Sequence, residues 1–274
     1  MKNLTKLMAI FTIVCVVFSL AACGEKKNAV DYSTSVDGAL VVAEAGSAGE
    51  ELATGDEFFA NAKFTAVDSM ATALLDVKSG TSDIAIVDYV TSIGSIGEGT
   101  DYTDLAVVKG KDFNPEEYGI AFRKGSDITP AVNAAIAELA AEGKLDEIGK
   151  TYKLDELVIK DGKAFDDAVT EGDLAYVKEK GELIIGMTLF APMNYYEGEE
   201  LVGFETEFAK AVCEKLGVKA KFVEINWNSK EIELNAKNID CIWNGMTITD
   251  ERLTNMSISV PYMQNKQVMV SKVK

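Results

Sequence analysis

The segment 239–252 holds side chains suited to binding a small anion. An apolar strand breaks at Asn244-Gly245, and the hydroxyls of Thr247 and Thr249 follow, just before Arg252. Glycine lets the backbone approach a small molecule closely, and Thr249 is a suitable helix cap. Free N–H groups, a hydroxyl and a guanidinium fork are what a carboxylate needs. A strand and a turn that end in a solvated arginine explain the same residues equally well.

A second candidate anion site lies near the start of the mature chain. The apolar segment Leu40–Glu44 is followed by Ala45-Gly46-Ser47-Ala48-Gly49 and then by a helix start at Glu50. A strand, a turn of small residues and a helix N-terminus together can hold an anion with backbone N–H groups. The turn lacks the lysine of a phosphate-binding loop and the glycine spacing of a dinucleotide site. The alternative is a tight strand-to-helix turn that binds nothing.

Asp88 follows the apolar strand 83–87. Ligands of open α/β sheets bind at the carboxyl ends of the strands, which makes Asp88 a candidate binding residue. Asp88 is also a suitable N-cap for a following helix, and the two roles do not exclude each other.

Composition excludes several classes of function. The 274 residues include 44 acids, 27 bases and no histidine, so the net charge is −17. This charge disfavours binding to nucleic acid and to anionic lipid surfaces. Without histidine, Ser-His and Cys-His nucleophile systems cannot form within the chain. We therefore predict no catalytic residues, no metal ligands and no cofactor.

The N-terminus has the features of an export signal. Lys2 and Lys6 precede an apolar segment, Met8–Leu20, that is too short to span a bilayer comfortably. Small residues directly before Cys23 resemble a bacterial lipoprotein signal. The resemblance implies cleavage after residue 22, a lipid on Cys23 and attachment to the outer face of the cell membrane. An ordinary secretory peptide is the alternative.

Two cysteines remain in the mature chain beyond Cys23. Cys213 lies on the apolar face of a predicted helix, and Cys241 lies in a predicted strand. A disulfide is compatible with export, but two buried thiols fit the pattern better. Their spacing is not that of a metal site.

Strands and helices alternate twice along the chain, once before Lys109 and once after Gly172. Apolar spacing predicts strands at 40–44, 63–67, 83–87, 105–108, 118–122, 182–187, 218–225 and 267–270. Helices are predicted from Ser69 to Gly80, from 126 to 152 in two parts, at 173–180, at 204–216 and at 230–236. This alternation predicts an α/β protein with two lobes, each built on a mostly parallel sheet.

Several of these segments together resemble the bacterial extracellular solute-binding proteins of the polar amino-acid type (family 3), which serve ABC importers. The motifs are Leu201-Val202-Gly203-Phe204-Glu205, the segment 239–242, Gly245–Arg252, the loop at Gly46-Ser47, and Tyr118–Gly125. The resemblance implies a periplasmic-binding-protein-like (type II) fold with a ligand cleft between the lobes. It covers most of the mature chain.

The resemblance also implies roles for individual residues. Arg252 would bind the ligand α-carboxylate, beside Thr247 and opposite Ser47. The Gly245 carbonyl and Asp88 would hold the α-ammonium. Phe190 and Trp227 would form aromatic walls, and Glu44, Tyr89, Asn194 and Asn244 would meet the ligand side chain. The family often has an acid where Thr188 stands and a hydroxyl where Ala48 stands, so Asp88 is the obvious anionic partner for the amine.

The order of the two halves is inverted relative to the family, as in a circular permutation. We expect a signal peptide at 1–22, a flexible tether at 23–37, a lobe at 38–114 and a second lobe at 115–274. The second lobe would carry the helices 126–152 and a linker at 153–172. New ends at Asp37 and Lys274 would leave one covalent crossing between the lobes, near 113–123. Residues near both termini would form the other crossing, paired but not joined.

The sequence thus predicts a lipid-anchored, monomeric receptor that binds a small polar amino acid and delivers it to an ABC permease. A binding protein of the same fold that senses its ligand without transport is one alternative. A dehydratase-like enzyme is another, which would need a titratable residue such as Glu44 or Asp88 beside a reactive carbon.

Overall fold

The computed structural model describes residues 31–273. The predicted signal peptide, Cys15 and Cys23 lie outside the described residues. Of the predicted tether, residues 31–37 are described: Val36 is buried, and Tyr32 packs against the same hydrophobic cluster. The folded body therefore begins a few residues before the predicted start at 38.

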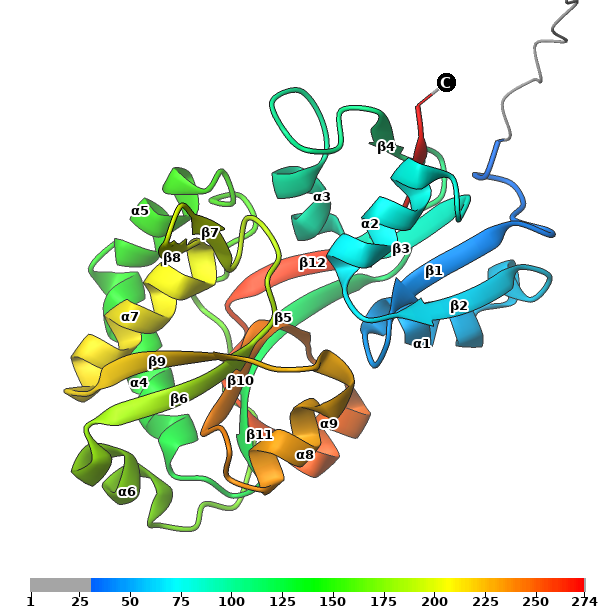
Figure 1. The fold of residues 1–274 in the computed structure, drawn as a ribbon. Helices are drawn as coiled ribbons and strands as arrows, with labels where there is room; N and C mark the ends of the chain where they lie inside the picture. The colour runs from blue at the N-terminus through cyan, green and yellow to red at the C-terminus, as the bar shows by residue number, and fades with distance from the viewer. Residues whose placement is uncertain (1–30, 274) are drawn as a thin grey trace, which may run out of the picture. The chain divides into compact units, whose positions relative to one another are not determined.

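One mixed sheet organises the fold, with strand order β2-β1-β3-β12-β5-β10-β6-β9 (Figure 1). Its two ends are parallel blocks, since β1 runs parallel to β2 and β3, and β6 runs parallel to β9 and β10. Antiparallel pairing of β12 with β3 and with β5, and of β5 with β10, joins the blocks. The predicted α/β class with two mostly parallel blocks is confirmed.

We call the part of the sheet from β2 to β3, with its helices, the first lobe. It contains β1 (Leu40–Glu44), α1 (Ala48–Gly55), η1 (Glu57–Phe59), β2 (Lys63–Val67), α2 (Met70–Ser79), β3 (Ile84–Asp88), α3 (Tyr89–Ser95) and β4 (Leu105–Val107). β4 pairs with the end of β12. The helix α3 follows Asp88, where the sequence suggested a helix start without giving its bounds.

The part from β5 to β9 is the second lobe. Its first elements are β5 (Pro115–Arg123), α4 (Ile128–Ala141), α5 (Lys144–Thr151), α6 (Asp173–Lys180), β6 (Glu182–Met187), β7 (Tyr195–Glu197), β8 (Glu200–Val202) and α7 (Phe204–Leu216). The remaining elements are β9 (Lys219–Glu224), η2 (Trp227–Ser229), α8 (Lys230–Asn235), β10 (Cys241–Thr247), α9 (Asp250–Asn255), β11 (Met256–Ile258) and β12 (Met263–Lys272). The strand β12 belongs to both lobes.

Strand periodicity places apolar side chains on both faces of each block. In the first lobe, Val41 and Ile86 pack on the α1 side, while Val42 and Val87 pack with Leu74 of α2. Burial on both faces explains why these strands are nearly continuous apolar runs in the sequence.

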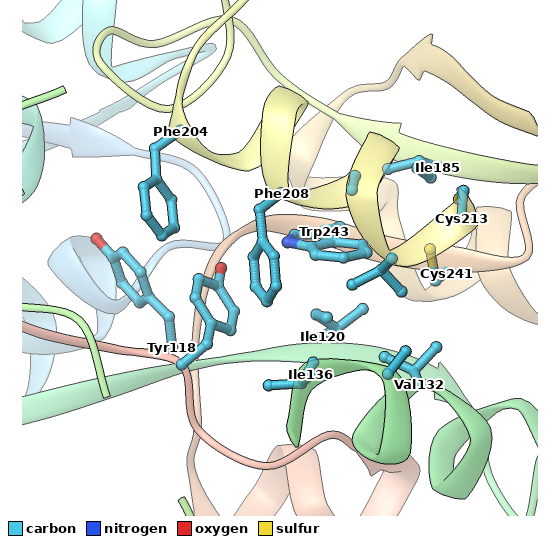
Figure 2. Packing of buried hydrophobic residues seen from close by; sticks show 14 of the residues in the cluster. Tyr118, Ile120, Val132, Ile136, Ile185, Phe204, Phe208, Cys213, Cys241 and Trp243 are labelled. Carbon is cyan, nitrogen blue, oxygen red and sulfur yellow. The ribbon is translucent and has the colours of Figure 1, made fainter. Parts of the chain in front are cut away.

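The larger core lies in the second lobe, under α4, α5 and α7. Phe208 meets Trp243 edge to face at 5.1 Å between ring centroids, and Ile120, Val132 and Ile136 close the same cluster (Figure 2). Residues of α4 and α5 belong to the same core, so both helices pack on this lobe. Cys213 of α7 and Cys241 of β10 are both buried and carry free thiols (Figure 2).

Two continuous strands cross between the lobes. β5 leads from the first lobe into the second, and β12 leads back: its residues 263–266 pair with β5, and its residues 267–270 pair with β3. The expectation of a single covalent crossing was wrong. The predicted last strand, 267–270, is only the second half of β12, and polar residues at 264–267 hid its first half.

The end of β12 and the start of β1 lie at the same end of the sheet. Val270 is opposite Ala85 of β3, and Val41 on the other side of β3 is opposite the preceding residue, Ile84. Only β3 therefore lies between the end of β12 and the start of β1.

Gly203, the N-cap of α7, has a backbone conformation that other residues rarely adopt, with φ of +126°. A Cβ there would overlap the Met193 carbonyl group. We expect Gly203→Ala to lower the free energy of unfolding by about 3 kcal/mol or more. Urea unfolding followed by circular dichroism measures this loss.

Gly198→Ala is the matched control, because Gly198 also has positive φ, +64°, but open space around the Cβ position. We expect it to cost only about 1 kcal/mol. Equal losses in the two variants would show that the contact with Met193 does not matter.

Candidate functional site

All eight predicted ligand-binding residues line one cavity. The lining residues are Glu44, Ser47, Ala48, Met70 and Asp88 from the first lobe, and Thr188, Phe190, Trp227, Asn244, Gly245, Thr247 and Arg252 from the second. The cavity has a volume of ≈ 10 Å³, room for about one water molecule. A bound amino acid would require the lobes to move apart.

Arg252 is held in the cavity wall by a helix cap, a nearby carbonyl and a carboxylate of the other lobe. Thr249 caps α9 as predicted, since its hydroxyl accepts the Arg252 N–H at 3.2 Å. The guanidinium donates to the Thr247 carbonyl at 2.8 Å and to Glu51 Oε1 at 2.8 Å. Arg252 is only 5% exposed, whereas the Glu51 side chain is 56% exposed. The contact with Glu51 is an ion pair between the lobes.

Gly245 sits at an irregularity in β10, where the pairing with β5 shifts register between Ile242 and Met246. Its φ is +54°, and a Cβ there would press on the Phe190 ring at 3.0 Å. The Gly245 N–H donates to Glu205 Oε1 at 2.7 Å. The predicted strand break at Asn244-Gly245 was wrong, because β10 continues through these residues to Thr247 and only its pairing with β5 is irregular. The Gly245 N–H already has a protein partner.

Glu205 holds this part of the site in place, and the sequence reasoning gave it no such role. Besides Gly245, Asn194 donates to its carboxylate at 2.7 Å, and the Tyr262 hydroxyl makes a short hydrogen bond to it. The pKa of Glu205 is raised to about 7, because the effect of burial exceeds the opposite effect of these hydrogen-bond donors. An acid in the first turn of a helix, among buried Phe204 and Phe208, was the available signal.

The loop around Ser47 differs in part from the predicted anion cradle. Ser47 caps α1, with its hydroxyl accepting the Glu50 N–H at 3.2 Å. The Gly46 N–H donates to Glu50 Oε2 at 2.6 Å, and the Ser47 N–H donates to the Glu44 carbonyl at 3.2 Å. The backbone N–H groups of Gly46 and Ser47 are thus bonded within the protein. The Ser47 hydroxyl is therefore the polar group of this loop that is best placed to contact a ligand in the cavity.

Asp88 is the N-cap residue of α3, but its side chain makes no capping hydrogen bond. Its Oδ1 instead accepts from Asn265 Nδ2 at 2.9 Å and from Gln267 Nε2 at 2.6 Å, two side chains of β12. The same two amides donate to Glu116 Oε2 of β5 at 3.0 Å each. Burial, and then the negative charge of Glu116, raises the pKa of Asp88 to about 7.

Lys230 is a second contact between the lobes that the sequence reasoning missed. Its ammonium donates to the Gly46 carbonyl at 2.9 Å and lies 4.8 Å from the centre of the Trp227 ring. Burial lowers its pKa to about 8. Phe190 and Trp227 are 7% and 4% exposed, and both line the cavity.

Of the four residues expected near the ligand side chain, Glu44 and Asn244 line the cavity and the other two do not. Asn244 is bonded to Thr188, accepting its N–H at 2.8 Å and donating to its carbonyl at 2.9 Å. Asn194 is fully buried behind the cavity against Glu205. Tyr89 lines a different hollow of ≈ 750 Å³, beside Glu117 and Lys266, that contains none of the eight predicted residues.

Comparison with known proteins places part of the chain in a family. Residues 183–274 match the sequence model described as "Bacterial extracellular solute-binding proteins, family 3".

Within residues 31–273, no helix is long and apolar enough to cross a membrane.

Two curated relatives of family 3 illustrate the match. The L-cystine-binding protein TcyJ of Escherichia coli (strain K12) is 37% identical over 113 residues, which cover 40% of this chain and 41% of that protein. The arginine-binding extracellular protein ArtP of Bacillus subtilis (strain 168) is 35% identical over 94 residues, covering 34% and 37%. The chain thus spans about two fifths of the length of the relatives it matches. Both relatives are named as binding proteins.

Among solved structures, the arginine-bound form of domain 1 from TmArgBP is 30% identical, with a TM-score of 0.32, and the match covers 36% of this chain and 84% of that chain. An ancestral cationic amino-acid solute-binding protein is also 30% identical, with a TM-score of 0.29 and coverage of 30% and 37%.

The buried acids make stability depend on pH. Burial, and then the charge of Asp88, raises the pKa of Glu44 from 4.5 to about 8, and Asp88 and Glu205 are raised to about 7. The folded chain therefore holds protons that the unfolded chain releases between about pH 5 and 8. Without added ligand, we expect the Tm to rise by roughly 5 °C as the pH is lowered from 8 to 5.

Differential scanning calorimetry at fixed ionic strength measures this dependence. The double variant Glu44→Gln, Asp88→Asn is the comparison, because it removes two of the three acids, and its Tm should change less with pH. A Tm that falls as the pH is lowered from 8 to 5 would contradict the raised pKa values of the three acids.

Proposed function

We propose that the chain is the substrate-binding component of an ABC amino-acid importer and captures a small polar amino acid between its lobes. One observation carries the proposal: Arg252 of the second lobe and Asp88 of the first lobe line the same cavity. A zwitterion loses its water only where both of its charges find fixed partners. A guanidinium and a carboxylate on opposite lobes are such partners.

Each predicted residue then has a defined part in binding. Arg252, with the hydroxyls of Thr247 and Ser47, takes the α-carboxylate. Asp88 and the Gly245 carbonyl take the α-ammonium. Phe190 and Trp227 flank the side chain, which points toward Glu44. Because partners for one ligand lie on both lobes, ligand binding favours the closed arrangement.

The wider setting is also part of the proposal. The chain carries a lipid on Cys23, lies outside the cytoplasmic membrane, acts as a monomer and presents its closed form to a permease. It binds its amino acid without transforming it. The family to which residues 183–274 belong is described as extracellular and solute-binding, and this supports the setting.

Isothermal titration calorimetry of residues 31–274 against the common L-amino acids tests the function. We expect at least one amino acid to bind, and Arg252→Ala to weaken that binding about 100-fold or more by removing the carboxylate partner. Glu51→Gln is the matched variant on the other side of the ion pair. Since Glu51 competes for the guanidinium, its replacement should leave the affinity unchanged or increase it.

Folded protein that binds no amino acid would refute the function. Binding that survives Arg252→Ala at full strength would refute the site.

We also propose that the chain is a circular permutation of the family order. The positions of β12 and β1 support this, because both strands end or begin at the same end of the sheet with β3 between them. In the family order, β12 would then continue through a short connection into β1. The segment 153–172 would be the connection that joins the family's usual ends.

A relinked chain tests the permutation. Residue 274 is joined to residue 31 by a short Gly-Ser linker, which keeps the buried Val36 in the chain, and the chain is opened near Gly172. We expect the ligand affinity to change by less than about threefold, because no strand or site residue is cut.

Opening the relinked chain between Lys266 and Gln267 is the control. That cut divides β12 between its pairing with β5 and its pairing with β3, and it should abolish binding. Loss of folding in the variant opened near Gly172 would count against the permutation.

A further inference from the structure

Glu44 is the buried charge of the cavity that the proposed zwitterion does not use. It is the last residue of β1, it lines the cavity, and it is only 3% exposed. Its Oε1 is fully buried and has no hydrogen-bond partner. Among the ion pairs of residues 31–273, none includes Glu44. A buried carboxylate oxygen without a partner is costly unless a ligand supplies one.

The neighbouring charged groups do not supply that partner. Asp88, at the end of the adjacent strand β3, is itself acidic and raises the pKa of Glu44. Lys230 of α8 is the cation whose charge acts on Glu44, but its ammonium donates to the carbonyls of Gly46 and Trp227. Glu44 therefore faces the cavity with one oxygen free.

A simple zwitterion leaves Glu44 without a partner. Glu44, Asp88 and Arg252 are the charged residues that line the cavity. In the proposed binding mode, Arg252 takes the α-carboxylate and Asp88 takes the α-ammonium. Above about pH 8, Glu44 is then an ionised carboxylate whose buried Oε1 has no donor. A ligand with a second positively charged group supplies that donor.

We propose that the ligand is a dibasic amino acid whose side-chain amine or guanidinium pairs with Glu44. This inference rests on the proposed function, because it assumes that Arg252 and Asp88 hold the α-carboxylate and α-ammonium. Phe190 and Trp227 then flank the aliphatic part of the side chain, between the zwitterion site and Glu44. The acid lies on the first lobe, so the side-chain contact adds to the attraction that closes the lobes.

L-Arginine and L-citrulline are suitable probes, because they have nearly the same shape and only arginine carries the side-chain charge. Calorimetry of residues 31–274 at pH 8.5 should show arginine binding about 30-fold or more tightly than citrulline. L-Lysine against L-norleucine is the second pair. The wild-type comparison needs no variant and is independent of any folding defect.

Variants then separate the side-chain contact from the α-ammonium contact. Glu44→Gln should reduce the arginine-to-citrulline ratio to about threefold or less, while citrulline binding changes little. Asp88→Asn should weaken both ligands by the same factor, because both have an α-ammonium. Circular dichroism checks that each variant is folded.

The outcomes distinguish this inference from the function on which it rests. Citrulline or norleucine binding as tightly as its charged counterpart would overturn the inference and leave amino-acid capture intact. An arginine-to-citrulline ratio that Glu44→Gln leaves unchanged would remove Glu44 from the contact. Folded wild-type protein that binds no amino acid would overturn both proposals.

Discussion

A buried charge must have a fixed partner, and most of the local structure around the cavity serves that requirement. Arg252 is almost completely buried and bonds to a carbonyl of its own lobe and a carboxylate of the other. Asp88 is equally buried and is held by two amides of β12. Desolvating either charge without these partners would cost several kcal/mol. The partners come from both lobes and from the crossing strands, so the charges tie the two lobes to one site.

The crossing strands are part of the site as well as of the hinge. Glu116 lies on β5, while Asn265 and Gln267 lie on β12, and these three side chains form one network with Asp88. Glu116 also accepts from the Thr247 hydroxyl at 3.2 Å. A rotation of the lobes about β5 and β12 would therefore disturb the surroundings of Asp88 directly.

Protonation explains how three acids remain buried close to one another. Burial raises the pKa of Glu44, Asp88 and Glu205, so that each can hold a proton near neutral pH. The acids differ in how their oxygens are satisfied. Glu205 has three donors and Asp88 has two, but Glu44 keeps a buried oxygen without one. The protein supplies donors to the first two acids, whereas the buried oxygen of Glu44 has none.

Local patterns in the sequence predicted most of the elements and the composition of the cavity. Apolar periodicity and caps such as Thr249 and Ser69 act within a few residues, so the order of strands and helices could be read directly. The eight predicted residues, among the twelve that line the cavity, followed from short motifs at the ends of strands and from the family resemblance built on them. The sequence reasoning gave no bounds for α3 and missed the first half of β12, where polar residues interrupt the apolar pattern.

The tertiary structure alone decided which groups meet. Glu51 lies 201 residues from Arg252, and Lys230 lies 184 from Gly46, so no local pattern could pair them. The same holds for the amides of β12 that reach Asp88, at separations of 177 and 179 residues. Sequence determined which charges this protein has and where they lie along its strands. Only the folded sheet, by bringing distant strand ends to one cavity, decided which charges are paired and that Glu44 is not.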